Sequence, residues 1–233
     1  MKLIKKVLLK FSGEAFGDKG GPILAERVKT VATEIKNLRA KGVRVAVVCG
    51  GGNISRWKDA RGKNIDRVAV DYKGMKGTFK NVTALEKTLK TLGIKTSVFA
   101  SFALAGEYPA FSYPVVKKAW DKGNVIIFAG GTGYPFFSTD MSAVLYSLIL
   151  NVDLFIKATK VDGVYTSDPK KHPSAKKFEK ISSREIVLKN LAVIDSPAIC
   201  LAGDNNLPIK ILQWESGAIL KVIKGGKSGT IIG

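Results

Sequence analysis

The sequence is poor in the side chains that most often bind metals or form disulfides. Its 233 residues include one histidine and two cysteines. His172 lies in a polar, turn-like segment, and a single histidine excludes His-rich metal sites and argues against a Ser-His-Asp triad. Cys49 and Cys200 lie far apart in apolar surroundings, without a C-x-x-C motif. Both are therefore predicted to be reduced core residues of a cytoplasmic protein.

Long apolar runs are also absent. No stretch is apolar over the roughly 20 residues that a membrane-spanning helix needs. The N-terminal segment MKLIKKVLLKF alternates apolar residues with lysine, as strands do, and no small-residue cleavage site follows it. We therefore expect a soluble, cytoplasmic protein that has no signal peptide and no contact with a membrane.

Acidic residues are few beside the basic ones. The chain has 38 Lys and Arg against 19 Asp and Glu, which gives a formal net charge of +19. Such an excess attracts polyanions, including nucleotides and nucleic acids. The lysines are, however, spread over the whole chain and lack interleaved aromatic residues, a distribution that favours an ordinary solvated surface. Binding of nucleic acid therefore stays open as a secondary role.

The apolar pattern alternates between strands and helices. Short apolar runs, most of them continuous, predict strands at residues 3–11, 43–49, 96–100, 125–129, 154–158, 209–212 and 230–232. Amphipathic runs predict helices at 22–41, 65–92, 115–122, 139–150 and 218–223, the second interrupted at Gly74 and Gly77. This alternation is typical of a mainly parallel sheet covered on both faces. We therefore expect an α/β fold, a three-layer αβα sandwich with a mainly parallel central sheet, in a single domain that covers residues 1–233.

Local signals predict further features. Residues 101–113 have no clear period and are expected to form a loop with short helical pieces. The dipeptide Asp162-Gly163 predicts the turn of a hairpin between 158–161 and 164–165. Ser182 and Glu185 have the spacing of a capping box, and residues 204–208 are expected to close another helix.

Two glycine-rich loops each follow a buried strand. Gly50-Gly51-Gly52-Asn53 comes directly after residues 43–49, and Gly130-Gly131-Thr132-Gly133 comes directly after residues 125–129. A strand, a glycine loop and a helix in succession aim backbone N–H groups at an anion. Because ligands bind at the carboxyl ends of parallel strands, we expect both loops, Lys10 and Thr159 to meet at one phosphate site.

Such a site suits phosphoryl transfer, which needs mainly positioning and stabilisation of negative charge. The chain lacks the P-loop pattern G-x-x-x-x-G-K-[ST], a G-x-G-x-x-G fingerprint after its first strand and the protein-kinase motifs. The expected chemistry therefore lies outside these three classes.

Six segments of the chain resemble, in order, motifs of the bacterial uridylate (UMP) kinases, which have the amino-acid-kinase fold. They are KFSGE at 10–14, GGGN at 50–53, DRVAVD at 66–71, GTGYPFFSTD at 131–140, KATKVDGVY at 157–165 and DNNLPI at 204–209. The first two are shared by the wider superfamily, whereas the fourth is highly specific to the uridylate kinases. The family pattern is not complete, since Ser55-Arg56-Trp57 stands where Phe-Arg-Gly is usual.

The resemblance implies transfer of the γ-phosphate of ATP to UMP, giving UDP and ADP in pyrimidine nucleotide biosynthesis, with Mg²⁺ accompanying ATP. Lys10 would bridge the transferring phosphate, Arg56 would clamp phosphate, and Asp140 would orient the catalytic cation. The implied ATP-binding residues are Lys10, Ser12, Gly13, Gly52, Arg56, Thr159, Tyr165 and Asp168. The implied UMP-binding residues are Gly51, Asp71, which would bind the ribose hydroxyls, Thr132, Gly133, Tyr134, Pro135, Phe136, Phe137, Ser138 and Thr139. No side chain is assigned as a metal ligand, and either Lys157 or Lys160 would add positive charge near ATP.

Several of these residues also have an ordinary structural interpretation. The alternatives are a surface lysine for Lys10, helix caps for Asp71 and Asp140, core aromatics for Phe136 and Phe137, and a turn residue for Asp168. In favour of the functional roles, Lys10 is a compact cation at a strand end, suited to charge that develops in a transition state. Arg56 is one of few arginines in a lysine-rich chain, which favours a bidentate phosphate contact.

Two other functions stay open. A superfamily member that phosphorylates a carboxylate or a carbamate, such as an acetylglutamate or carbamate kinase, would share Lys10 and the first glycine loop but not the 132–140 sequence. A nucleic-acid-binding or regulatory protein with the same fold would bind in a strongly salt-dependent way. The resemblance further implies a homo-oligomer, a hexamer as in the family, with GTP and UTP as effectors.

Overall fold

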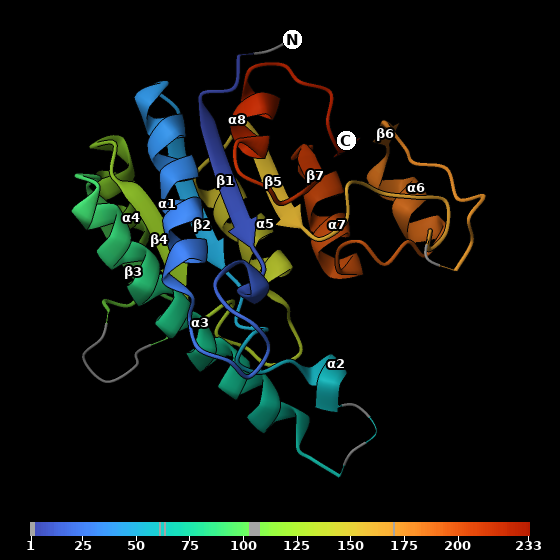
Figure 1. Cartoon of the computed structure of the whole chain (residues 1–233), viewed down its shortest axis with the longest axis horizontal. Coiled ribbons are helices and arrows are strands. Elements are labelled where there is room, and N and C mark those ends of the chain that lie inside the picture. The colour runs from blue at the N-terminus through green and yellow to red at the C-terminus, as the bar shows by residue number, and fades with distance from the viewer. Residues whose placement is uncertain (1–2, 61, 63, 103–107, 170) are drawn as a thin grey trace.

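The protein is described from a computed structural model, covering residues 3–60, 62, 64–102, 108–169 and 171–233 (Figure 1). Within these residues, eight strands form one sheet in the order β3-β4-β2-β1-β5-β7-β8-β6. The strands are β1 (Lys6–Phe11), β2 (Arg44–Cys49), β3 (Thr96–Ala100), β4 (Val125–Ala129), β5 (Leu154–Thr159), β6 (Lys180–Ile181), β7 (Ile209–Gln213) and β8 (Thr230–Ile232). The six strands from β3 to β7 run parallel, and β8 is antiparallel to β7. The predicted mainly parallel sheet is thus confirmed.

Helices cover both faces of the sheet, as Figure 1 shows. They are α1 (Ala25–Ala40), α2 (Trp57–Ala60), α3 (Arg67–Thr91), α4 (Tyr113–Asp121), α5 (Thr139–Ile149), α6 (Ser183–Leu188), α7 (Ser196–Asp204) and α8 (Ala218–Ile223), with a 3₁₀ turn η1 (Gly13–Ala15). One buried apolar cluster joins the sheet to α1, α3 and α8, and the other joins it to α4, α5, α6 and α7. Burial of apolar side chains on both sheet faces drives this three-layer packing. Among the described residues, no helix combines the length and the apolarity needed to cross a bilayer.

Helix α3 differs from its predicted form, because it runs through Gly74 and Gly77 without a break. Each glycine lies against the segment that follows the first glycine loop. A Cβ added at position 74 would lie 2.9 Å from the carbonyl oxygen of Ser55, and one at position 77 would lie 2.7 Å from Cβ of Ile54. The glycines therefore allow close packing, which outweighs their weak helix propensity.

Other local predictions had mixed outcomes. The capping box of Ser182 and Glu185 is confirmed, and α8 and β8 have the predicted bounds. The hairpin at 158–165 is wrong, since Tyr165 pairs with Lys177 and the Val164 N–H donates to Thr230 Oγ1 at 2.8 Å. Of the region 101–113, residues 103–107 lie outside the described chain; the described remainder has no helix before Tyr113.

The two cysteines also differ from each other. Both are free, and Cys49 is buried in β2 as predicted. Cys200 is exposed, which makes its predicted core position wrong. Helix α7 buries Ala198, Ile199 and Ala202 instead, so position 200 falls on the outward side of that helix.

A buried carboxylate ties α1 to α8. Glu34 is 1% exposed, and its two oxygens accept the backbone N–H groups of Gly217 and Leu220, each at 2.8 Å. These N–H groups belong to the N-cap residue and the first turn of α8, where backbone N–H groups have no intrahelical partner. Glu34 therefore caps a helix that is far from it in sequence.

We expect Glu34→Ala to lower the free energy of unfolding by about 1–3 kcal/mol, because it leaves buried N–H donors without acceptors. Urea denaturation of the purified protein measures this change. Lys36→Ala, on the exposed side of the same helix, is the control and should stay within about 0.5 kcal/mol. Equal stability of the two variants would contradict the capping role.

Candidate active site

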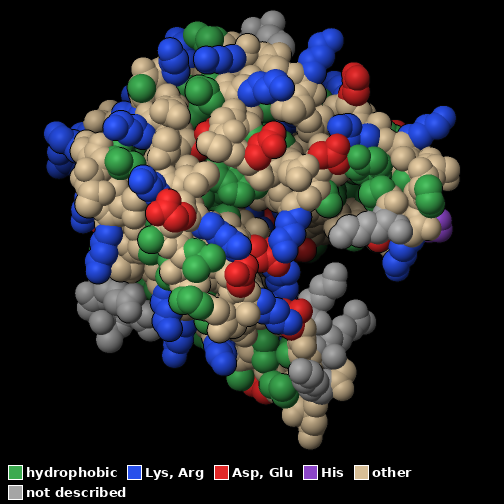
Figure 2. Space-filling model, in the orientation of Figure 1, with side chains coloured by type: hydrophobic (Ala, Val, Ile, Leu, Met, Phe, Trp, Pro, Cys, Tyr) green, Lys and Arg blue, Asp and Glu red, His purple; other side chains and the backbone are tan. Residues whose placement is uncertain are grey.

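A cavity of about 950 Å³ lies at the carboxyl ends of the central strands. Lys10 of β1, the Gly50–Gly52 loop after β2, Gly131 after β4 and Thr159 of β5 all line it, so the segments expected to meet do so. Residues 190–197, which comprise the link from α6 to α7 and the first two residues of α7, form another part of the wall. Figure 2 shows this face hollowed between the α6 side and the α2 side, with basic and acidic side chains gathered at the hollow.

The floor of the cavity holds two lysines and one carboxylate. Lys10 and Lys157 are direct partners on the adjacent parallel strands β1 and β5, which brings two like charges side by side. Asp140, in the first turn of α5, lies between them. Its Oδ1 is 2.9 Å from Lys10 Nζ, and its Oδ2 accepts a hydrogen bond from Lys157 Nζ. Lys157 also donates to the carbonyl of Val193 at 2.7 Å.

Burial and charge act in opposite directions on this cluster. Asp140 is only 4% exposed, and burial alone would raise its pKa, but Lys10 and Lys157 hold that pKa well below the usual range. Burial lowers the pKa of the Lys157 ammonium, and Asp140 opposes that effect. The cluster therefore keeps an ionised carboxylate and an excess of positive charge at the base of the cavity.

Helix α3 holds both glycine loops. The Asn81 side-chain amide donates to the carbonyl of Gly50 at 2.7 Å and exchanges hydrogen bonds with the fully buried Asn53. Thr78 Oγ1 accepts from the N–H of Gly130 at 2.7 Å. The side chains of one helix thus fix loops that follow two different strands.

The first glycine loop also touches the turn after β1. A Cβ added to Gly13 would lie 2.4 Å from Oδ1 of Asn53 and 2.7 Å from the backbone nitrogen of Gly52. Only glycine permits this approach without displacing the loop. The chain after Lys10 and the Gly50–Gly52 loop are therefore held together at the cavity wall.

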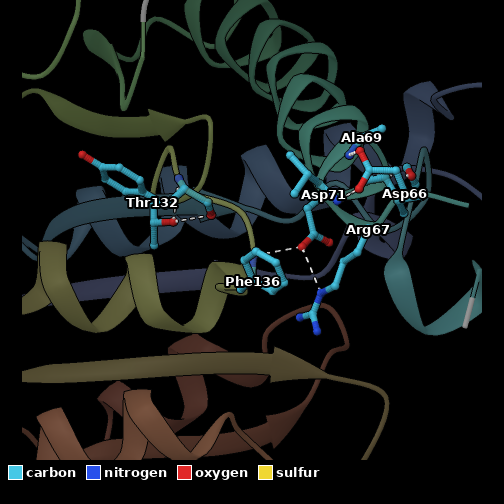
Figure 3. Close-up of polar contacts among 10 residues, drawn as sticks. Asp66, Arg67, Ala69, Asp71, Thr132 and Phe136 are labelled. Atoms are coloured by element: carbon cyan, nitrogen blue, oxygen red, sulfur yellow. Dashed lines mark hydrogen bonds and ion pairs between the residues drawn. The ribbon is translucent and has the colours of Figure 1, made fainter.

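Asp71 occupies the opposite wall, on α3 (Figure 3). Its Oδ2 accepts the backbone N–H of Phe136 at 2.9 Å and Nε of Arg67 at 3.4 Å. Phe136 has a left-handed backbone, with φ of 71°, and its ring is 61% exposed. A non-glycine residue in this region of φ and ψ is uncommon and points to a constraint from its surroundings. The contact between the Phe136 N–H and Asp71 supplies such a constraint.

The chain matches the family model described as "Amino acid kinase family" over residues 5–213. The chain belongs to the amino acid kinase family. A uridylate kinase of Rickettsia bellii is 43% identical over 222 residues, 94% of this chain and 93% of that protein. A uridylate kinase of Brucella abortus is 40% identical over 230 residues, 98% and 96% of the two chains. The crystal structure of a UMP kinase from Bacillus anthracis has a TM-score of 0.93 and 34% identity, covering 99% of this chain and 96% of that one. The resemblance to uridylate kinases within this family is thereby confirmed.

The cavity brings together most of the residues that the uridylate-kinase resemblance picks out. Those that line it are Lys10, Ser12, Gly13, Gly51, Gly52, Arg56, Asp71, Phe136, Phe137, Ser138, Thr139, Asp140 and Thr159. Lys157 and Lys160 both line it. The Lys157 side chain is only 12% exposed, whereas Lys160 is exposed and its Nζ lies 3.2 Å from Glu14 Oε2. Of the two lysines left open by the sequence, Lys157 is the one built into the floor.

The other predicted residues lie outside the cavity lining. These are Thr132, Gly133, Tyr134, Pro135, Tyr165 and Asp168. Thr132 Oγ1 and the backbone of Tyr134 bond to each other, and the Tyr134 side chain is 70% exposed. The Tyr165 hydroxyl donates to Asp162 Oδ1 at 2.8 Å. That hydrogen bond raises the pKa of Tyr165.

Several ordinary structural interpretations fail in this family member. Asp66, not Asp71, caps α3 (Figure 3), and Ser138, not Asp140, caps α5 by accepting a hydrogen bond from the Asp140 N–H. Phe136 and Phe137 are 61% and 47% exposed, so they are not core residues.

Sequence reasoning gave no role to Trp57, Arg67 or residues 190–197, which also line the cavity. Trp57 was visible only as a departure from the family pattern. The 190–197 segment carries no glycine loop or charge pattern that could have marked it. Its part in the site follows from the Lys157–Val193 bond, which depends on the folded chain.

Proposed function

We propose that this chain catalyses transfer of the γ-phosphate of ATP to UMP, giving ADP and UDP for pyrimidine nucleotide synthesis, and that its 233 residues act as one domain. The observation that carries the proposal is the buried Lys10–Asp140–Lys157 cluster at the floor of a cavity walled by two glycine loops. Relatives and structural neighbours named uridylate or UMP kinase support the choice of acceptor. The 131–140 sequence, which is specific to that family, distinguishes UMP from carboxylate or carbamate acceptors.

In this proposal Lys10 supplies the positive charge at the reaction centre. Phosphoryl transfer asks mainly for in-line positioning and for fixed charge near the equatorial oxygens. Among the described residues, Lys157 donates hydrogen bonds to Asp140 and Val193, whereas Lys10 has only an ion-pair contact of 2.9 Å with Asp140. Since each ammonium group has three N–H donors, Lys10 is the lysine with more donors left for phosphate. Asp140 holds both ammonium groups in place, so that little reorganisation is needed as charge develops.

The glycine loops would hold the phosphates on either side of Lys10. Gly13 and Gly52 meet at one wall, next to Arg56, and would bind ATP together with Ser12 and Thr159. Arg56 Nη1 is 4.0 Å from Glu14 Oε1, a long contact that a phosphate could replace. Tyr165 and Asp168 remain proposed ATP contacts outside the cavity lining. On the acceptor side, Gly51, Asp71 and the segment from Thr132 to Thr139 would surround UMP.

The donor set fits magnesium that arrives with the nucleotide. Within the described residues, no group of three His, Cys, Asp or Glu side chains could cage an ion. Glu14 and Asp195 do line the cavity and offer carboxylate oxygens. Mg²⁺ in phosphate-transfer sites commonly takes one or two carboxylates together with phosphate oxygens and water. Bound in that way, the ion would neutralise part of the charge on the transferring phosphate.

The proposal extends to assembly and location. We propose a homo-oligomer, hexameric like the family that the sequence resembles, with GTP and UTP as effectors and a cytoplasmic location. Two free cysteines support a reducing compartment. The resemblance alone supports the hexamer and the effectors, and gel filtration with light scattering tests the oligomer.

A direct assay tests the reaction. Purified protein with ATP and magnesium is given UMP, CMP, dUMP, N-acetylglutamate or carbamate, and ADP formation is followed at two salt concentrations. We expect turnover selective for UMP and weakly dependent on salt. Absence of turnover with every acceptor in folded protein would overturn the proposal and favour a binding role, which steep salt dependence of nucleic-acid affinity would then identify.

Asp71→Asn tests the acceptor wall, the part of the cavity around Asp71 and Phe136 that would bind UMP. Loss of the negative charge weakens the proposed contacts to the ribose hydroxyls, so we expect KM for UMP to rise roughly tenfold, which is about 1.4 kcal/mol, while KM for ATP changes less than twofold. Steady-state kinetics with each substrate varied in turn measures both constants. Asp121→Asn, an exposed aspartate on α4, is the control and should leave both unchanged. Equal increases for ATP and UMP would contradict the role of Asp71.

A further inference from the structure

Arg67 lies between two aromatic rings and a carboxylate at the acceptor wall. Its guanidinium carbon is 4.6 Å from the centre of the Phe136 ring and 5.5 Å from that of the Trp57 ring. Its Nε is 3.4 Å from Asp71 Oδ2. All four residues line the cavity, and they come from three segments: α2, the start of α3 and the loop after β4. Figure 3 shows Arg67, Asp71 and Phe136. Arg67 is the member that contacts the other three.

Helix stability does not explain an arginine at this position. Arg67 is the first residue of α3, where the helix dipole disfavours positive charge. Its partner Asp71 is four residues later, and a basic residue before an acidic one is the weaker order for such a pair. The side chain is also 39% exposed, so the core gains little from it. What the arginine does supply is a planar cation that can stack on rings and bond to a carboxylate at once.

The contacts of Asp71 are unequal between its two oxygens. Oδ2 accepts from both Arg67 and the Phe136 N–H, whereas none of the described residues is seen to donate to Oδ1. The side chain is 16% exposed and faces the cavity. Two donors on one oxygen fix the rotation of the carboxylate and leave the other oxygen for a ligand.

We propose that Arg67 is a positioning residue for acceptor recognition. It holds Asp71 and the loop at Phe136 in one arrangement, so that Asp71 presents Oδ1 to the ribose hydroxyls of the nucleoside monophosphate. The inference rests on the proposed function, because it takes Asp71 as the ribose contact. It adds that Trp57, which stands where glycine is usual in the family, helps to hold Arg67 in place through its ring contact with the guanidinium.

The test uses four single variants of the full chain, one of them the Asp71→Asn variant described above, and one double variant. Arg67→Gln removes the charge and the planar cation, and Arg67→Lys keeps the charge but loses the stacking plane. Lys73→Gln, an exposed change of charge on the same helix, is the matched control. Calorimetry gives the Kd of UMP, and kinetics give kcat and both KM values.

We expect Arg67→Gln to weaken UMP binding roughly tenfold, with KM for ATP and kcat within about twofold of wild type. Arg67→Lys should recover only part of the loss, and Lys73→Gln should match the wild type. In an Asp71→Asn background, Arg67→Gln should add less than about twofold, because a residue that acts through Asp71 is coupled to it.

Three outcomes would overturn the inference. Unchanged UMP affinity in folded Arg67→Gln and Arg67→Lys, with an active wild type, would remove the role of Arg67 and leave the proposed function intact. Additive effects in the Asp71→Asn background would show that Arg67 does not act through Asp71. A folded wild type that neither binds nor phosphorylates UMP would refute the proposed function, and this inference with it.

Discussion

Lys10→Ala should lower the turnover of UMP by a factor of roughly one hundred or more, with little change in UMP affinity. The ammonium is fixed on β1 by its contact with Asp140 and has donors left for the transferring phosphate. The transition state spreads negative charge over the equatorial oxygens of that phosphate, and a cation positioned for this arrangement stabilises it more than it stabilises the bound ground state, so removal of the cation slows the chemical step. Single-turnover kinetics with saturating ATP and UMP measures the chemical step directly.

The control for this variant lies on the same strand. Lys6→Ala changes a lysine at the opposite, amino end of β1, away from the cavity lining. It should retain wild-type turnover, which separates a local effect from a general loss of positive charge. Wild-type turnover in Lys10→Ala would refute the assignment of Lys10, and a comparable loss in Lys6→Ala would point to damage of the sheet.

The sequence was sufficient to predict the sheet and the edge that carries the site. Continuous apolar strands that alternate with helices indicate a mainly parallel sheet, and the residues that follow the carboxyl ends of its strands converge on one edge. Lys10, the Gly50–Gly52 loop and Thr159 accordingly lie around one cavity. These signals are local to each segment, and the parallel arrangement of the strands then brings the segments together at one edge of the sheet.

Contacts between distant segments could not be predicted in the same way. Propensity marks Gly74 and Gly77 as breaks in α3, but their close approach to residues 54 and 55 is visible only once the chain is folded. Lys157 and Lys160 look alike in sequence, and the register of β5 beside β1 places Lys157 opposite Lys10. Asn81, which carries no motif, holds the first glycine loop because α3 packs beneath it. Each of these depends on packing between elements and not on local pattern.

Asp140→Asn should be the most destabilising change at the site, lowering the free energy of unfolding by about 3–5 kcal/mol at pH 7. The substitution leaves Lys10 and Lys157 side by side on paired strands, nearly buried and without a counter-charge. Urea denaturation measures the loss. Asp121→Asn is the control, since it removes an exposed carboxylate that pairs with Arg44 and Lys117 and should cost less than about 1 kcal/mol.

The difference in unfolding free energy between the wild type and Asp140→Asn should depend on pH, because the pKa of Asp140 is depressed in the folded protein. An aspartate whose pKa is lower in the folded state contributes its stabilisation fully above the unfolded value of about 3.9 and loses it as pH falls through the folded value. The stability gap between wild type and Asp140→Asn should therefore be widest near neutral pH and narrow below about pH 4. A gap that stays constant down to pH 3 would show that the charge of Asp140 is not what stabilises the cluster.

A second substitution shows whether the stability lost in Asp140→Asn is due to unpaired charge or to altered packing. In Asp140→Asn with Lys157→Met, the methionine fills much of the space of the lysine stem and removes the uncompensated positive charge. Because an unpaired buried charge is costlier than an apolar replacement, the double variant should recover at least half of the lost stability. Its turnover should stay low, since the asparagine no longer holds Lys10 as an ion pair. Failure of the double variant to regain stability would attribute the loss to packing around α5, and the two lysines would then be no more than neighbours of Asp140.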